Sequence, residues 1–409
     1  MISFEAGVIK EYQENIFLPS PYTDKPLLKC VGLFGKNAGG KSNFIRALSF
    51  MKEFVLDSSK ESSSTKQINV TPFLLSTESE HNPSTFEVLF HDDNKRYKYG
   101  FSITRKQVES EWLFVTSKNK EETLFLRSRQ DFVFEKKIKS DAKAKLELLT
   151  QLTRGNSLFI SVLAQFNNPI GEIVSNWFNN IIIAKDTDHL ALIDFTARLM
   201  SMNDYKRRII EIIKHSDLGI ESIDEKLKET AQKTNYSYDF LKSIVHSEEN
   251  NYVVKTKHIK YSGKKDSNEQ VVFDLLQNES FGTQKFFGIL GPILYSLREK
   301  KIIWIDELDA RMHTLLFEVM VKIFNSEKYN PNGAQLLFTS HNQYALKKGL
   351  RRDQMIMVEK DKYGVSSIGS VYQKSPKTRN DASFDKEYLS GKYGAIPRIQ
   401  SQLDLFEGL

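Results

Sequence analysis

A chain of 409 residues that is 40% hydrophobic and 11% aromatic has enough apolar material to fold around a sizeable core, which excludes a disordered protein. Its 58 basic and 52 acidic residues give a net charge of +6, which permits nucleic-acid binding without requiring it. The single cysteine, Cys30, excludes an internal disulfide and an all-cysteine metal cage, as is usual in a reducing cytosol.

A glycine-rich loop follows the first predicted strand. Residues 27–34 are mostly apolar, the loop GKNAGGKS runs from Gly35 to Ser42, and a helical pattern begins directly after it. The spacing G-x-x-x-x-G-K-S lets backbone N–H groups surround a polyphosphate at a helix N-terminus. We expect Lys41 to bridge the β- and γ-phosphates of ATP, and Ser42 to bind Mg²⁺. The residues expected at the nucleotide are Gly35, Asn37, Gly40, Lys41, Ser42 and Asn43.

Strands and then helices are predicted in the middle of the chain. Alternating residues from Phe86 to Phe114, with the turn-rich HDDNKRYKYG between them, indicate a hairpin. Helix-period stretches such as VSNWFNNIII, LIDFTARLM and YKRRIIEIIKHS occupy residues 171–250. No heptad pattern continues long enough for an extended coiled coil, so we expect a compact helical lobe.

Basic residues gather in three later segments. In VKTKHIKYSGKK, Val254 to Lys265, basic and aromatic residues alternate, which is typical of a nucleic-acid surface and also of an exposed edge strand protected by lysines. Arg351 and Arg352, before the predicted edge strand MIMVEKD, are either a solvated charge pair or a contact for a partner, phosphate or nucleic acid. A second basic loop before the tail has the same two interpretations, solvated charges or a binding surface. It contains Lys374, Lys377 and Arg379.

A carboxylate pair follows a buried strand. The apolar run Ile302–Ile305 ends directly before Asp306 and Glu307, so both carboxylates emerge where a central parallel strand ends. Asp306 fits the role of holding Mg²⁺ through water, and Glu307 that of the base that polarises an attacking water. The alternative is an ordinary acidic turn after a strand.

One histidine closes the next predicted strand. The segment QLLFTSHN, residues 335–342, contains His341, whose position suits a contact with the γ-phosphate. A lone histidine after a strand is more often a satisfied core or surface residue. In this chain it follows the glycine-rich loop and the carboxylate pair in the order that a nucleotide site requires.

The segment ESFGTQK, Glu279 to Lys285, resembles the ABC signature. Read alone, S-x-G is a common loop or helix cap. The resemblance implies that Ser280 and Gly282 reach across a dimer interface to the γ-phosphate on the partner chain. It also places Asp309 in the family's D-loop, which contacts the partner subunit. Gln165 is then either the glutamine that senses Mg²⁺ or an ordinary helix residue.

The chain as a whole resembles the stand-alone prokaryotic AAA-15/AAA-21 ATPases, relatives of the SMC-type and overcoming-lysogenization-defect (OLD) ATPases. It is most similar to the ATPase subunits of abortive-infection systems of the AbiL or RloA kind, which are paired with a small Toprim-type nuclease such as RloB. Phe281 departs from the small or acidic residues common in the signature. The segments that carry the resemblance are TPFLL, STFEVLF, RYKYGF, ESEWLF, NSLFISVLAQFN, ESFGTQK, GAQLLFTSHN and the tail YLSGKYGAIP.

The expected fold is therefore α/β, with an ABC-type P-loop NTPase core, a mixed sheet with an antiparallel side, and a compact helical lobe. Residues 1–170 would form the first lobe, 171–250 the helical insertion, and 251–409 the second lobe with the signature, the carboxylates, the switch histidine and the tail. Only 68 residues follow His341, too few for a Toprim fold, so we expect any nuclease to be a separate subunit.

These features predict an ATPase that acts as a homodimer or higher oligomer, with ATP between two copies and Mg²⁺ as the metal. The resemblance to the abortive-infection ATPases implies that it regulates a Toprim or HNH nuclease in anti-phage defence. No segment has the roughly 18 apolar residues of a spanning helix or the opening of a signal peptide, so we expect a cytoplasmic protein with no membrane partner. A DNA-clamping repair ATPase and the energising subunit of a transporter are the competing functions.

Overall fold

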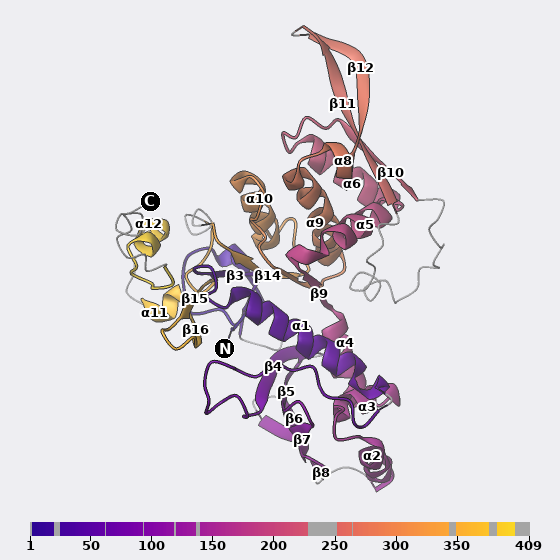
Figure 1. The fold of residues 1–409 in the computed structure, drawn as a ribbon, viewed down its shortest axis with the longest axis vertical. Helices are drawn as coiled ribbons and strands as arrows, with labels where there is room; N and C mark the ends of the chain where they lie inside the picture. The colour runs from indigo at the N-terminus through magenta and orange to yellow at the C-terminus, as the bar shows by residue number, and fades with distance from the viewer. Residues whose placement is uncertain are drawn as a thin grey trace, which may run out of the picture.

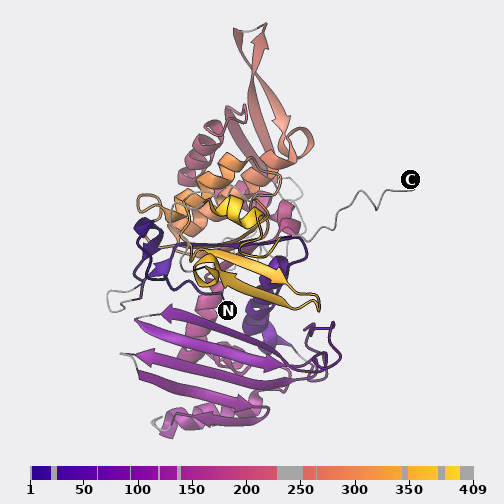
Figure 2. The same ribbon diagram turned by 90° about the vertical axis from the view of Figure 1, so that its left-hand side faces the viewer.

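The structure is a computed structural model that describes residues 2–19, 25–61, 63–92, 94–117, 120–135, 140–227, 252–263, 265–342, 349–375 and 383–396. Its layers are stacked along the long axis of the molecule, with an antiparallel sheet at one end and a helical lobe at the other (Figures 1 and 2). A six-stranded sheet lies between them. None of the helices in these residues has the length and apolar character needed to cross a bilayer.

The six-stranded sheet carries the nucleotide-site segments. Five of its strands are parallel and one edge strand is antiparallel. Both faces are covered, which explains why the parallel strands are continuously apolar. In their order across the sheet the strands are β16 (Ser366–Ser370), β15 (Met355–Lys360), β3 (Cys30–Phe34), β14 (Gln335–Ser340), β13 (Ile302–Ile305) and β9 (Ile181–Ala184).

The second sheet is an antiparallel meander, more extensive than the predicted hairpin. Helix α1, Lys41–Asp57, lies between the two sheets (Figure 1). Its Phe50 and Phe54 rings pack against the meander, with ring centroids 5.3 Å from Phe86 and 5.7 Å from Phe101. The strands are β4 (Ser84–Asp92), β5 (Lys95–Ile103), β6 (Val108–Ser117), β7 (Lys120–Ser128) and β8 (Asp131–Phe134).

Helices cover the opposite face of the six-stranded sheet. The central pair is α5, His189–Met200, and α9, Phe281–Arg298, with α6, Asn203–Lys214, beside them. Beyond them lies a three-stranded sheet whose hairpin projects from the molecule (Figure 2). Its strands are β10 (Ser222–Leu227), β11 (Tyr252–Ser262) and β12 (Lys265–Asp274).

Short elements complete the fold. The bounds of the remaining helices are α2 (Ser140–Leu152), α3 (Phe159–Gln165), α4 (Pro169–Asn179), α8 (Leu275–Asn278), α10 (Thr314–Asn325), α11 (Val371–Lys374) and α12 (Phe384–Leu389). The short strands and 3-10 turns are η1 (Gln13–Asn15), β1 (Ile16–Phe17), β2 (Leu27–Leu28), η2 (Ser58–Lys60) and η3 (Asp186–Asp188).

Alternating residues of β3 serve two separate cores. Cys30 and Phe34 pack in the core under the helical lobe, and Cys30 is buried as its apolar surroundings predict. Val31 and Leu33 point to the other face and join the core around α1 and the meander. This double burial fixes the glycine-rich loop that follows the strand.

Three segments that form strands were predicted wrongly, one as a helix and two as edge strands. We placed 181–183 in a helix of the helical lobe, but β9 pairs in parallel with β13 and belongs to the core sheet. We expected 355–361 at a sheet edge, but β15 pairs with both β3 and β16. Similarly, β11 is the middle strand of its sheet and not an edge strand. The proposed boundary near residue 250 lies outside the described residues.

The basic segments are largely neutralised. On β11, Lys255 lies 3.0 Å from Asp274 and Lys260 lies 3.1 Å from Glu269. Arg351 is fully buried against Asp353, at 2.9 Å, which contradicts the interpretation as a solvated charge pair.

Arg352 and Lys374 are paired with acidic residues as well. Arg352 is buried and donates to Glu11 at 2.9 Å, so the second member of the pair is not solvated either. Lys374 pairs with Glu359, whereas Lys377 and Arg379 lie outside the described residues.

Candidate active site

The loop from Gly35 to Ser42 joins β3 to α1 as predicted, and the packing requires two of its glycines. A Cβ atom on Gly35 would lie 2.3 Å from the Val358 carbonyl oxygen of β15. Gly40 has a φ of 115°, and a Cβ there would lie 2.4 Å from the Ser366 hydroxyl. The Ser366 hydroxyl also donates to the Gly39 carbonyl at 2.8 Å. The neighbouring strands therefore support the loop so closely that only glycine fits.

Lys41, near the end of the loop, is buried. Its ammonium donates to the carbonyls of Gly35 at 2.7 Å and Lys36 at 3.1 Å, and lies 3.3 Å from His341 Nδ1. Burial lowers the pKa of Lys41, and the nearby Glu307 and acidic neighbours partly offset this. Among the described residues no carboxylate contacts this ammonium directly, and a desolvated cation of this kind is well suited to a polyphosphate.

Asp306 emerges from β13 beside the first turn of α1. The Ser42 hydroxyl donates to Asp306 Oδ1 at 3.3 Å. The Thr339 hydroxyl of β14 donates to the same oxygen at 2.6 Å and accepts from the Glu307 N–H at 2.7 Å. One threonine therefore fixes both predicted carboxylate residues.

Glu307 is held in an uncommon backbone conformation. Its φ is 51°, in the left-handed region that residues other than glycine rarely adopt. Its carbonyl accepts from the Lys285 ammonium at 2.7 Å, so the peptide is fixed on both sides. The side chain is left half-exposed, with Oε1 3.9 Å from His341 Nε2. The carboxylate therefore lies beside His341, whose other ring nitrogen is next to Lys41.

His341 stands between Lys41 and the carboxylates, as β14 lies between β3 and β13. Burial and the Lys41 charge lower the pKa of His341, and the acidic neighbours only partly oppose this shift. The imidazole is therefore neutral at neutral pH and can accept or donate a hydrogen bond.

Asp309 connects His341 to the loop after β13, residues 306–313, which we call the carboxylate loop. Its Oδ2 accepts from the His341 N–H at 3.2 Å. Its Oδ1 is buried and has no hydrogen-bond partner among the described residues. An unsatisfied buried carboxylate oxygen at this position is consistent with a contact from outside the chain.

The signature segment begins α9. The Ser280 hydroxyl caps the helix by accepting from the Thr283 N–H at 3.1 Å. A Cβ on Gly282 would lie 2.4 Å from the Arg311 carbonyl, so the helix start packs directly on the loop after Asp309. Phe281 is exposed, and the Arg311 guanidinium lies 5.1 Å from its ring centre. Both Ser280 and Phe281 therefore face outward.

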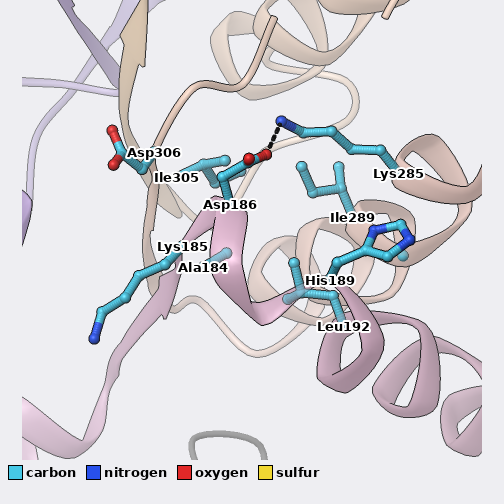
Figure 3. A pocket seen from close by; sticks show the side chains of 10 residues that line it. Ala184, Lys185, Asp186, His189, Leu192, Lys285, Ile289, Ile305 and Asp306 are labelled. Atoms are coloured by element: carbon cyan, nitrogen blue, oxygen red, sulfur yellow. Dashed lines mark hydrogen bonds and ion pairs between the residues drawn. The ribbon is translucent and has the colours of Figure 1, made fainter. Parts of the chain in front are cut away.

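A small pocket lies next to Asp306, between the end of β9 and helices α5 and α9 (Figure 3). Lys285 extends across it and donates to Asp186 at 2.9 Å. Because Lys285 also donates to the Glu307 carbonyl, this one side chain connects helix α9 both to Asp186 and to the loop after β13.

Among the described residues, Asn37, Asn43 and Gln165 have no hydrogen bond to the side chains of this cluster. Asn37 is exposed on the loop, and Asn43 is exposed in the first turn of α1. Gln165 is the exposed last residue of α3, whose start is bound to Ser58 at the far end of α1 from Lys41. Its contact with Mg²⁺ stays a prediction.

Sequence reasoning missed Thr339, Lys285 and Ser366 as supports of the site. Thr339 had a detectable signal, because it precedes His341 by two residues and alternate residues of a strand share a face. Lys285 and Ser366 act through contacts between distant segments, for which the sequence has no spacing rule.

The residues present fit ATP and Mg²⁺. The loop has the close backbone approach and buried cation that a polyphosphate needs. The Ser42 hydroxyl and the Asp306 carboxylate supply the hard oxygen ligands that Mg²⁺ prefers, already beside each other. The group Mg²⁺–ATP is thus compatible with the donor set of this structure.

Comparisons with known proteins agree with the site at the level of the family. A family profile described as "AAA domain, putative AbiEii toxin, Type IV TA system" matches residues 30–347, which include the loop, the signature, both carboxylates and His341. Curated proteins give no match.

Among solved structures the chain is similar to two forms of the recombination mediator RecF of the RecFOR pathway. RecF with ATP is 13% identical, with 84% of this chain and 93% of that chain covered and a TM-score of 0.27. RecF with ATPrS is 12% identical, with 85% and 95% covered and the same TM-score of 0.27. Because the family profile covers most of the sequence, the chain belongs to this family of AAA-type ATPase domains.

Proposed function

We propose that the protein hydrolyses ATP at this site and uses the reaction to control a separate effector. The observation that carries the proposal is the meeting of Lys41, Ser42, Asp306, Glu307 and His341 at the carboxyl ends of three adjacent strands. Mg²⁺, held by Ser42 and Asp306, would neutralise charge on the phosphates.

Hydrolysis is assigned to Glu307 and His341. The Glu307 carboxylate accepts a proton from the attacking water, whose oxygen forms a bond to the γ-phosphorus while the bond to the β-γ bridging oxygen breaks. ADP leaves with that oxygen. The neutral His341 contacts the γ-phosphate, and Lys41 stabilises the charge that develops on the phosphate oxygens.

The active form is proposed to be a head-to-tail dimer. Ser280 is exposed at the start of α9, where its hydroxyl group and the helix N-terminus are directed away from the chain's own core. Asp309 carries a buried oxygen without a partner in the described residues. A head-to-tail dimer would give both groups a partner. Ser280 of one copy would meet the ATP on the other copy, and Asp309 would contact the partner chain.

The biological role is proposed to be anti-phage defence with a Toprim or HNH nuclease as the effector. The family description, which refers to a toxin and a type IV toxin–antitoxin system, supports this class of function. The lysines of β11 are paired with acids, so direct nucleic-acid binding has little support from this segment. A nuclease gene adjacent to this gene would support the proposal, and a permease gene there would contradict it.

Replacing Glu307 by Gln tests the assigned base. The amide keeps the shape of the side chain but cannot accept the proton, so ATP turnover should fall at least about a hundredfold. ATP binding should persist, and the ATP-bound dimer should accumulate. Phosphate release and size-exclusion chromatography with ATP measure the two effects.

Glu78→Gln is the matched control, because Glu78 is an exposed carboxylate outside the site. It should hydrolyse ATP at the normal rate. If Glu307→Gln also hydrolyses ATP normally, Glu307 is not the base. If the unmodified protein neither binds nor hydrolyses ATP, the proposed activity itself is wrong.

A further inference from the structure

The described part of the tail motif, Tyr388 to Ile396, packs on the core and has no role in the mechanism above. Helix α12 and the residues after it lie beside β15 and the glycine-rich loop (Figure 1). The core under the helical lobe, to which Cys30 of β3 belongs, also includes four buried residues of the tail: Phe384, Tyr388, Tyr393 and Ala395. A terminal segment with this burial is held in a defined position and not merely appended.

One carbonyl of the tail is bound directly to the glycine-rich loop. The Lys36 N–H donates to the Ala395 carbonyl at 2.9 Å. The Tyr388 hydroxyl donates to the same carbonyl at 3.0 Å, so the tail's own side chain fixes the acceptor. Ala395 has a φ of 60°, which is uncommon for alanine and turns its carbonyl out of the regular chain direction.

This contact sets the plane of the peptide that holds Lys41. The Gly35 carbonyl and the Lys36 N–H belong to one trans peptide, so they point in opposite directions. The carbonyl accepts from the Lys41 ammonium at 2.7 Å, and the N–H donates to Ala395. Because Gly35 permits many backbone conformations, these two hydrogen bonds help to select one orientation of the peptide.

Contacts with β15 hold the tail in place. The Lys374 ammonium donates to the Tyr393 carbonyl at 3.1 Å and pairs with Glu359 of β15. Gly394 has a φ of 69°, and a Cβ there would lie 2.1 Å from the Glu359 carboxylate. An alanine at this position would therefore have to move the Glu359 carboxylate, which pairs with Lys374.

We infer that residues 384–396 are a positioning element for the phosphate-binding loop, which fixes the Gly35–Lys36 peptide and thereby the starting position of Lys41. The inference rests on the proposed binding of ATP. Docking of the tail and binding of ATP should be coupled, so a weakened tail contact should reduce ATP affinity, and ATP should protect the tail from exchange.

Replacing Tyr388 by Phe removes the hydroxyl that fixes the Ala395 carbonyl and leaves the ring in the core. We expect the Kd for a fluorescent ATP analogue to rise by about three- to tenfold, the loss of one hydrogen bond. Hydrogen exchange at the Lys36 amide should be faster, while exchange in the middle of α1 stays unchanged. Tyr261→Phe, at an exposed position of β11, is the control.

Replacing Gly394 by Ala moves the Glu359 carboxylate away from Lys374, whose ammonium holds the Tyr393 carbonyl, and should therefore loosen the tail and give the same two effects. Gly263→Ala is its control, because Gly263 also has a positive φ, of 64°, but nothing lies within 4 Å of an added Cβ. Thermal melts show that each variant is folded.

The outcomes separate the inference from the proposed function. If the unmodified protein does not bind the analogue, ATP binding is wrong. If it binds, and folded Tyr388→Phe and Gly394→Ala bind as tightly as their controls, or the Lys36 amide exchanges at its normal rate, the tail does not position the loop.

Discussion

At the scale of single residues, Thr339 is the support on which both carboxylates depend. Its hydroxyl accepts from the Glu307 N–H and donates to Asp306, and the side chain is fully buried. Thr339→Val keeps the shape but leaves the Glu307 N–H without its partner, at a cost of about 1–3 kcal/mol. We expect ATP turnover to fall by about tenfold or more, with a smaller change in ATP affinity.

Steady-state kinetics and binding of an ATP analogue measure this separation. Thr339→Ser retains the hydroxyl and should recover most of the activity. Thr116→Val, at a half-buried position on β6, should have normal kinetics. Equal turnover in Thr339→Val and the unmodified protein would show that Glu307 does not need this support.

The predicted residues that the structure brings together share a property that sequence can reveal. Lys41, Ser42, Asp306 and Glu307 each follow a strand or begin a helix, and their chemistry allows few other roles in that position. Gln165 lacks such a marker, since a glutamine near a helix end is common. Its role is therefore the least determined by the sequence.

At the scale of elements, the contact between α5 and α9 depends on small residues. A Cβ on Gly291 would lie 2.3 Å from the Thr196 hydroxyl and 2.8 Å from its Cα, whereas one on Gly288 would meet its nearest atoms at 3.3 Å. The Thr196 hydroxyl also donates to the Gly288 carbonyl at 2.8 Å. The helices therefore meet most closely at Gly291.

Gly291→Ala should destabilise the protein by about 1–3 kcal/mol, because the added methyl group separates the two helices. Gly288→Ala is the matched control within the same helix. Its smaller steric conflict should be offset by the better helix propensity of alanine, about 1 kcal/mol. Urea unfolding compares the two, and an equal free energy of unfolding for both variants would contradict the close contact at Gly291.

The elements that were predicted wrongly show the limit of local patterns. The run 181–183 follows a helix without a break, and a short apolar run fits a strand as well as a helix. Only its parallel pairing with β13, more than a hundred residues later, makes it a strand. Similarly, β11 is a middle strand because β10 and β12 both pair with it.

At the scale of the whole molecule, the site depends on segments from both ends of the chain. Gly35 lies against Val358, and Lys36 is bound to Ala395. The motifs predicted the chemistry and the α/β class, because strand, loop and helix are adjacent in sequence. They did not predict the tail contact, because no spacing rule relates residues this far apart.

The proposed dimer can be tested with two variants, each of which damages a different half of the shared site. Lys41→Ala should remove the phosphate contact of its own copy. Ser280→Asp should keep the helix cap, since aspartate caps helices well, and repel the γ-phosphate on the partner copy. Each variant alone should be inactive. A mixed dimer has one site with both Lys41 and Ser280 intact.

Mixing the two variants in equal amounts should therefore restore ATP turnover. If copies pair at random and the sites act independently, about a quarter of the unmodified rate should return. Phosphate release measures the rate, and differently tagged copies show that mixed dimers form. Activity of Ser280→Asp alone, or mixed dimers without any turnover, would contradict a site shared between two chains, because that arrangement requires the signature of one copy to complete the loop of the other.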